Sequence, residues 1–112
     1  MDESEVLPVL TDEDKFIHEP ARLLILSYLY IADKIDFVFL RNQTGLTDGN
    51  LSSHMAKLEE REYISVEKKF IGKKPQTIYK LTQKGRDAFR EYREKMKKVF
   101  KETKTRNGVK KK

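Results

Sequence analysis

The apolar residues of the chain recur at helical spacing over its first half and alternate with polar residues in its second half. The first helical stretch begins near Pro20, a residue favoured at the first position of a helix, and runs through Ala32. Only Arg22 and Ser27 are polar in its interior. A helix that is apolar almost all round must be covered on several sides, by the rest of a small domain and, as an open alternative, by a second chain.

A turn and two shorter helices are predicted next. Residues 33–36 are typical of a polar turn, and residues 37–44 of a short helix that Gly45 stops. Thr47 can cap the following helix, which extends to about Arg61. Its apolar positions recur at helical spacing and are Leu51, Met55 and Leu58. These two helices are therefore joined by one tight turn that contains glycine.

From Ile64 onward the period becomes that of a β-strand. Every second residue points to one face, and these residues are Ile64, Val66, Lys68 and Phe70. Residues 77–81 form the next strand, with Tyr79 and Leu81 facing inward, and residues 71–76 between the strands supply Gly, Pro and two lysines. The pattern predicts a hairpin with a basic tip, and it places Phe70 and Tyr79 in the core.

The two ends of the chain carry further helical signals. Thr82 is predicted to cap a last helix reaching Phe100, with an apolar stripe spaced 3, 4 and 3 as in a coiled-coil seam, formed by Phe89, Tyr92, Met96 and Val99. Near the N-terminus, residues 11–14 are a possible helix start. The stripe is too short for an isolated coiled coil, so we expect it to pack against a second chain, either on the first helix, including Leu23, or on the arm from Val6 to Leu10. A stripe folded back on its own domain is the alternative.

The order helix, short helix, tight turn, helix, hairpin and long helix is that of a winged helix-turn-helix. The expected fold is α+β, mainly α, with a two- or three-stranded antiparallel wing and a long C-terminal helix. Residues 47–64, TDGNLSSHMAKLEEREYI, resemble the recognition-helix segment of small ArsR-like and MarR-like transcriptional regulators. Residues 18–22, HEPAR, resemble the opening of their first helix, and residues 79–85, YKLTQKG, are similar to their return strand and closing helix.

This resemblance covers roughly residues 16–98 and implies binding to double-stranded DNA. We expect a homodimer, because two copies would read half-sites about one helical turn apart. Two departures accompany it. ArsR-type metal sensors use cysteines, which this chain lacks, so metal sensing is not implied. Glu62 and Tyr63 stand where many relatives have one residue followed by glycine.

Charge is distributed unevenly along the chain, whose net charge is +6. Residues 1–19 carry seven acids and one lysine, whereas residues 101–112 carry six bases and one acid. We therefore divide the chain into an acidic arm (1–17), a winged-helix domain with its dimerisation helix (18–100) and a basic disordered tail (101–112). The tail fits either a polyanion partner or a solubilising end.

The candidate DNA contacts lie on the third predicted helix and on the hairpin. On a helical wheel, Asn50, Ser53 and Lys57 share one free face with His54 and Arg61. These types of side chain reach base edges and phosphates, although a solvated helix face would look similar. Asp48 either serves the helix N-terminus or contacts a cytosine. The full candidate set is Thr47, Asn50, Ser52, Ser53, His54, Lys57, Arg61, Lys69, Lys73 and Lys74.

Other functions find little support in the sequence. The two histidines, His18 and His54, have no acid at ligand spacing, the glycines match no phosphate-binding loop, and no base stands beside a nucleophile. We expect no enzymatic activity, cofactor or metal.

The longest apolar stretch, residues 23–32, is too short to span a membrane, so we expect a cytoplasmic protein. Two alternatives to a sequence-specific regulator remain: a protein-interaction module, and a non-specific DNA- or RNA-binding protein.

Overall fold

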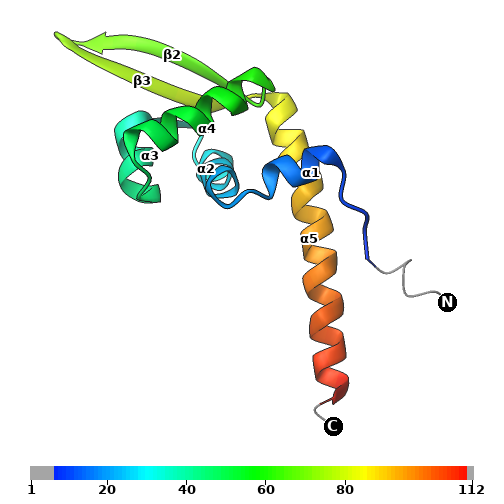
Figure 1. Cartoon of the computed structure of the whole chain (residues 1–112). Coiled ribbons are helices and arrows are strands. Elements are labelled where there is room, and N and C mark those ends of the chain that lie inside the picture. The colour runs from blue at the N-terminus through cyan, green and yellow to red at the C-terminus, as the bar shows by residue number, and fades with distance from the viewer. Residues whose placement is uncertain (1–6, 111–112) are drawn as a thin grey trace.

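The computed structural model describes the backbone of residues 7–110 and the side chains of residues 7–103 (Figure 1). Its elements follow in the order α1 (Asp12–Ile17), α2 (Pro20–Ile31), β1 (Lys34–Asp36), α3 (Phe37–Thr44), α4 (Asp48–Glu60), β2 (Ile64–Ile71), β3 (Lys74–Leu81) and α5 (Gln83–Lys110). The β2–β3 hairpin and α5 project from the helical body in different directions, which gives extents of 63 × 26 × 22 Å. The predicted mainly helical α+β fold is confirmed.

One apolar core joins the helices to the sheet. The apolar α2 lies at its centre, and Ile25, Leu26 and Leu29 are fully buried there. The apolar face predicted for α4 is buried as well and consists of Leu51, Met55 and Leu58. The helix starts follow the predicted chemistry, since the Thr47 hydroxyl accepts a hydrogen bond from the Asn50 backbone N–H. Gly45 ends α3 in the left-handed conformation with φ of 72°.

The segment expected to be a polar turn contains a third strand instead. β1 pairs antiparallel with β3 in a sheet of order β1-β3-β2, and Ile35 lies opposite Tyr79. Both side chains are buried. A three-residue strand with one apolar position produces too little alternation to be recognised, and its pairing with β3 decides its conformation.

The hairpin is longer than predicted, because β2 and β3 continue until only Gly72 and Lys73 remain in the turn. Gly72 has φ of 65° at the first turn position, as a type II′ turn requires. Tyr79 is buried as expected, but Phe70 is 72% exposed, so its placement in the core was wrong. Alternation gives the face of a strand correctly, but no element within residues 7–110 covers that face at Phe70.

At the N-terminal side, α1 packs against α5. Thr11 and Asp14 form a capping box, which confirms the helix start. The Asp14 carboxylate also accepts a hydrogen bond from Lys95, and the His18 ring is hydrogen bonded to the Tyr92 hydroxyl. His18 thus links the end of α1 to α5 through Tyr92. The first six residues of the acidic arm lie outside the described residues.

Helix α5 begins after Thr82, whose hydroxyl accepts a hydrogen bond from the Gly85 N–H and donates one to the Glu62 carbonyl. A Cβ on Gly85 would collide with the Tyr63 carbonyl oxygen, so the close approach of α5 to the connection between α4 and β2 requires glycine. The helix continues to Lys110, and its predicted end at Phe100 was therefore too early. The mobility of the tail stays a prediction, and the last two residues lie outside the described part.

The apolar stripe of α5 is largely used inside its own chain. Phe89 and Tyr92 are buried in the core, and the Phe89 ring lies 5.1 Å from the ring of Tyr30. Met96 packs against the same core and is partly buried. The inner half of the predicted intermolecular seam is therefore intramolecular. Among the described helices, none is long and apolar enough to cross a membrane.

Candidate nucleic-acid interface

Helix α4 presents a polar face to solvent. Asn50, Ser52, Ser53 and Lys57 are exposed, as predicted. Thr47 is exposed too, although its hydroxyl is already used as the helix cap. The exposed set therefore offers an amide and two hydroxyls in the N-terminal half of the helix and an ammonium group, that of Lys57, in its last turn.

His54 does not belong to this free face. Its side chain is 18% exposed, and its Nδ1 lies 3.3 Å from an Arg22 guanidinium nitrogen and 3.9 Å from a Glu19 carboxylate oxygen. Burial acts to raise the pKa of Glu19, but the Arg22 backbone N–H and the charges of His54 and Arg22 lower it overall. The burial of His54 could not be predicted from the sequence, because a helical wheel of α4 does not indicate where the start of α2 lies.

Arg61 is also engaged within the chain. Its guanidinium lies 3.9 Å from the centroid of the Phe16 ring, and the Arg22 guanidinium lies 4.1 Å from the same centroid. Burial raises the pKa of the nearby Tyr63, and the charge of Arg61 opposes this rise only in part. Phe16 thus holds α2 and the end of α4 together, a positioning role that sequence analysis missed because these contacts connect residues far apart in the chain.

Asp48 occupies the first turn of α4, where a carboxylate complements the helix N-terminus. It also forms an ion pair with Arg41 at 3.2 Å, which links α3 to α4 across the tight turn. Both side chains are exposed enough for this pair to contribute little stability. The geometry favours the interpretation of Asp48 as a first-turn acid.

The wing adds a concentration of positive charge. All four lysines of the hairpin end are exposed, and none pairs with an acid among the described side chains: Lys68, Lys69, Lys73 and Lys74. Lys84, by contrast, lies 3.6 Å from Glu62. The unpaired lysines leave the wing available to a polyanion.

A groove of about 360 Å³ connects the wing to α4. Lys68 and Thr77 of the sheet line one side, and Ser52, Ala56 and Glu59 of α4 line the other. Helix α4 and the side of the wing that faces it therefore adjoin across this groove. Glu59 is the acidic residue on it, and it lies toward the C-terminal end of α4.

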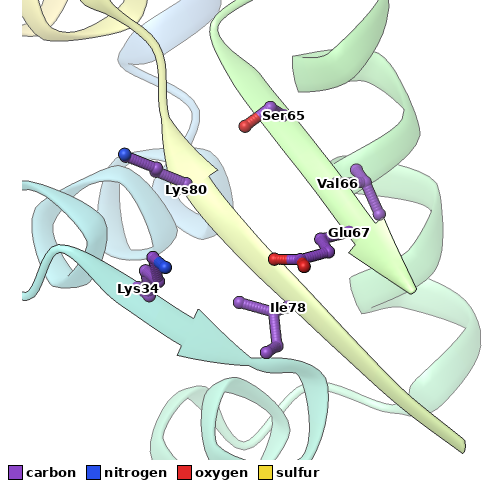
Figure 2. Close-up of a pocket in the computed structure, with 6 residues that line it drawn as sticks. All are labelled: Lys34, Ser65, Val66, Glu67, Ile78 and Lys80. Atoms are coloured by element: carbon purple, nitrogen blue, oxygen red, sulfur yellow. The ribbon is translucent and has the colours of Figure 1, made fainter. Parts of the chain in front are cut away.

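The other side of the sheet is differently composed. Figure 2 shows Lys34, Lys80 and Glu67 around a shallow hollow on that side, whereas Val66 points toward α4. Lys34 and Lys80 are cross-strand neighbours, and both are exposed. In the described residues, no group of three or more His, Cys, Asp or Glu side chains could hold a metal ion.

Comparison with known proteins agrees with this geometry. Residues 21–100 match the winged helix DNA-binding domain family. An uncharacterised protein of Methanocaldococcus jannaschii is 40% identical over 78 residues, which is 70% of this chain and 85% of that protein. A transcriptional regulator homologue from Pyrococcus horikoshii has a TM-score of 0.74 and 27% identity, over 80% of this chain and 88% of the other.

The fold is also shared with a protein solved on DNA. The structure of overoxidised AbfR bound to DNA has a TM-score of 0.65 at 18% identity, and the match covers 87% of this chain and 80% of AbfR. The match to residues 21–100 includes α3, α4 and the complete wing. The chain therefore belongs to the winged helix DNA-binding domain family, with a structure similar to those of transcriptional regulators.

Proposed function

We propose that the protein is a sequence-specific, dimeric transcriptional regulator. In this proposal α4 enters the major groove, and the wing lies on the phosphate backbone or in the minor groove. The observation that carries the proposal is the groove in which Ser52 of α4 and Lys68 of the wing lie together. Exposed polar residues of α4 adjoin it on one element, and further exposed lysines without an acidic partner among the described side chains adjoin it on the other. Such a surface combines groups that read bases with groups that neutralise phosphates.

The roles follow from chemistry and position. Asn50 and Ser53 lie on the N-terminal half of α4 and are the candidates for hydrogen bonds to base edges. Lys57, one turn later, suits a phosphate or a guanine. Apart from its own helix backbone and its chain neighbours, a Cβ on Gly49 would meet no atom of the described residues within 4 Å, so internal packing does not require glycine there. A bare backbone at this point would let a DNA strand approach closely.

Dimerisation is the second component of the proposal. A helix of 28 residues is about 42 Å long, more than the helical body needs for its own cover. Phe100 is 65% exposed beyond the body, Ile31 on α2 is 83% exposed, and Val99 is only partly buried. These outer residues could pack against a second copy, which would place two recognition helices on half-sites about one helical turn apart.

Selection of bound duplexes from random DNA, followed by titration at several salt concentrations, tests this function. We expect one pseudo-palindromic sequence to be enriched, with log affinity falling by about 0.9 per neutralised phosphate for each unit of log salt. Equal binding to selected and random duplexes, or to RNA, would indicate a non-specific binder. No salt-dependent binding at all would indicate a protein-interaction module.

A further inference from the structure

The tip of the β2–β3 hairpin carries two adjacent large apolar side chains that nothing in the described chain covers. Phe70 is 72% exposed and Ile71 is 61% exposed. Their burial contributes almost nothing to the folded state, because both remain largely in contact with water. A turn by itself needs only the residues that set its backbone, such as Gly72, so turn geometry does not explain the apolar pair either.

The surroundings of this pair indicate the chemistry of its partner. Four exposed lysines without ion-pair partners in the described part flank it, at positions 68, 69, 73 and 74. Alternation along β2 puts Phe70 on the same face as Val66 and Lys68, and Lys68 lines the groove shared with α4. Opposite Phe70 in the register stands Pro75, a second rigid apolar residue. The apolar tip is therefore continuous with the proposed DNA surface, and its charge complements a polyanion.

The length and width of the hairpin fit the adjacent groove. Ile71 lies five positions beyond Val66, so the end of β2 is about 16 Å along the strand from the contact of Val66 with the core. The body still reaches the hairpin at Gln76, which donates a hydrogen bond to Asp36, and Phe70 and Ile71 lie beyond that point. The major groove is about 12 Å wide, so a hairpin of this reach can cross the phosphate backbone beside it. The turn contains only Gly72 and Lys73, which makes the end narrow enough for a minor groove about 6 Å wide.

We propose that Phe70, backed by Pro75, enters the minor groove beside the recognition helix as an apolar wedge that unstacks a base step and bends the duplex. The flanking lysines hold the phosphates on both sides of it. Because pyrimidine–purine steps such as TA unstack most easily, Phe70 becomes a determinant of specificity at a step that α4 does not touch. This inference rests on the proposed DNA-binding function.

Energy transfer between dyes at the two ends of a short duplex tests the wedge. A duplex of about 20 base pairs is nearly straight by itself, because the persistence length of DNA is about 150 base pairs, and its ends are about 70 Å apart, where energy transfer responds to bending. The duplex carries the sequence selected by the full chain or, if none is enriched, a mixed sequence containing one TA step. We expect the parent protein to increase the transfer. Phe70→Ala should bind roughly tenfold more weakly and leave the duplex straight.

Two controls separate the wedge from other roles of the tip. Phe70→Leu keeps an apolar side chain and should retain most of the bending. Phe70→Ala keeps all lysines, so its salt dependence should equal that of the parent, and its thermal unfolding should be unchanged because Phe70 is exposed.

Different results would contradict the proposed DNA-binding function and the proposed wedge. A parent protein that binds no duplex would overturn the proposed function and the wedge together. A parent that binds and bends no differently from Phe70→Ala would overturn the wedge alone. A changed sedimentation coefficient for Phe70→Ala would assign the tip to contact with a second copy, and this also would overturn the wedge.

Discussion

The carboxylate of Asp14 on α1 accepts a hydrogen bond from the ammonium group of Lys95 on α5, although 81 positions separate them in the sequence. The Asp14 side chain is 4% exposed and that of Lys95 is 25% exposed. Burial alone would raise the pKa of Asp14, but the bonds from Lys95 and from the Thr11 backbone and hydroxyl lower it below its ordinary value. This pair fixes the N-terminal helix to the body.

The first prediction is that Asp14→Asn lowers the free energy of unfolding at pH 7 by about 1–3 kcal/mol. Asparagine keeps an acceptor for the Thr11 N–H but loses the charge paired with Lys95. Because the pKa of Asp14 is lowered by folding, its contribution is complete above about pH 4 and is lost as the pH falls through the lowered pKa. Urea titrations should therefore show a large difference in the free energy of unfolding between parent and variant at pH 7 and a smaller difference at pH 3.

Lys95→Met provides the matched control, since it leaves the buried carboxylate unpaired. This variant should also have a lower free energy of unfolding at pH 7. The double variant should lose less free energy of unfolding than the sum of the losses of the two single variants. Strict additivity would show that Asp14 and Lys95 do not interact in solution.

The second prediction concerns Glu62, which has φ of 63°. A residue with a Cβ is strained in this left-handed conformation, whereas glycine adopts it freely. Its ion pair with Lys84 is exposed on both sides and contributes little. Glu62→Gly should therefore raise the free energy of unfolding by about 0.5–1 kcal/mol in urea titrations. Glu62→Ala also removes the ion pair but keeps the Cβ, and an equal gain from it would contradict the explanation by backbone strain.

This residue also illustrates what could be read from the sequence. The resemblance to known regulators placed the departure from the usual glycine at Glu62 and Tyr63, and the structure identifies Glu62 as the left-handed residue. Helices and their caps were predictable because periodicity and capping are local, as Thr47 and Thr82 show. Strand β1 was not, because its pairing partner lies more than 40 residues away.

The candidate site was also predictable only where it depends on local pattern. The exposed positions on α4 were identified correctly for Asn50, Ser53 and Lys57. His54 and Arg61 lie on the same side of a wheel but contact Arg22 and Phe16, and such contacts depend on how α2 is oriented. The exposure of a strand residue likewise depends on whether another element reaches it. Local pattern gives the face, and tertiary structure decides whether that face is free.

The third prediction separates base reading from positioning. Asn50→Ala or Ser53→Ala should reduce the preference for the selected duplex over a random one by about 1–3 kcal/mol for each base contact. Lys73→Ala combined with Lys74→Ala should weaken both duplexes alike and reduce the salt slope by about 1.8 per protomer. Fluorescence anisotropy at several salt concentrations measures both quantities. Equal losses on the two duplexes for the helix variants would limit α4 to phosphate contacts.

The last prediction concerns the outer part of α5. Phe89 and Tyr92 are buried in their own chain, so a contact with a second copy must use residues farther along the helix. Phe100 is exposed and Val99 only partly buried, and neither supports the core of its own protomer. Val99→Glu combined with Phe100→Glu should therefore leave thermal unfolding of the protomer nearly unchanged. Association should be lost, because four carboxylates would be brought together at the contact.

Sedimentation at tens of micromolar protein measures this directly, since a dimer with micromolar or tighter Kd is mostly assembled there. We expect the parent to sediment as a dimer and the variant as a monomer. The affinity of the variant for a selected palindromic duplex should fall by at least about tenfold, because two half-sites are then no longer bound by one linked particle. Val99→Ile with Phe100→Leu keeps the surface apolar and should behave as the parent does. A parent that is already monomeric at this concentration would remove the outer part of α5 as a dimer contact, and a single recognition helix and wing would then have to provide all of the binding energy.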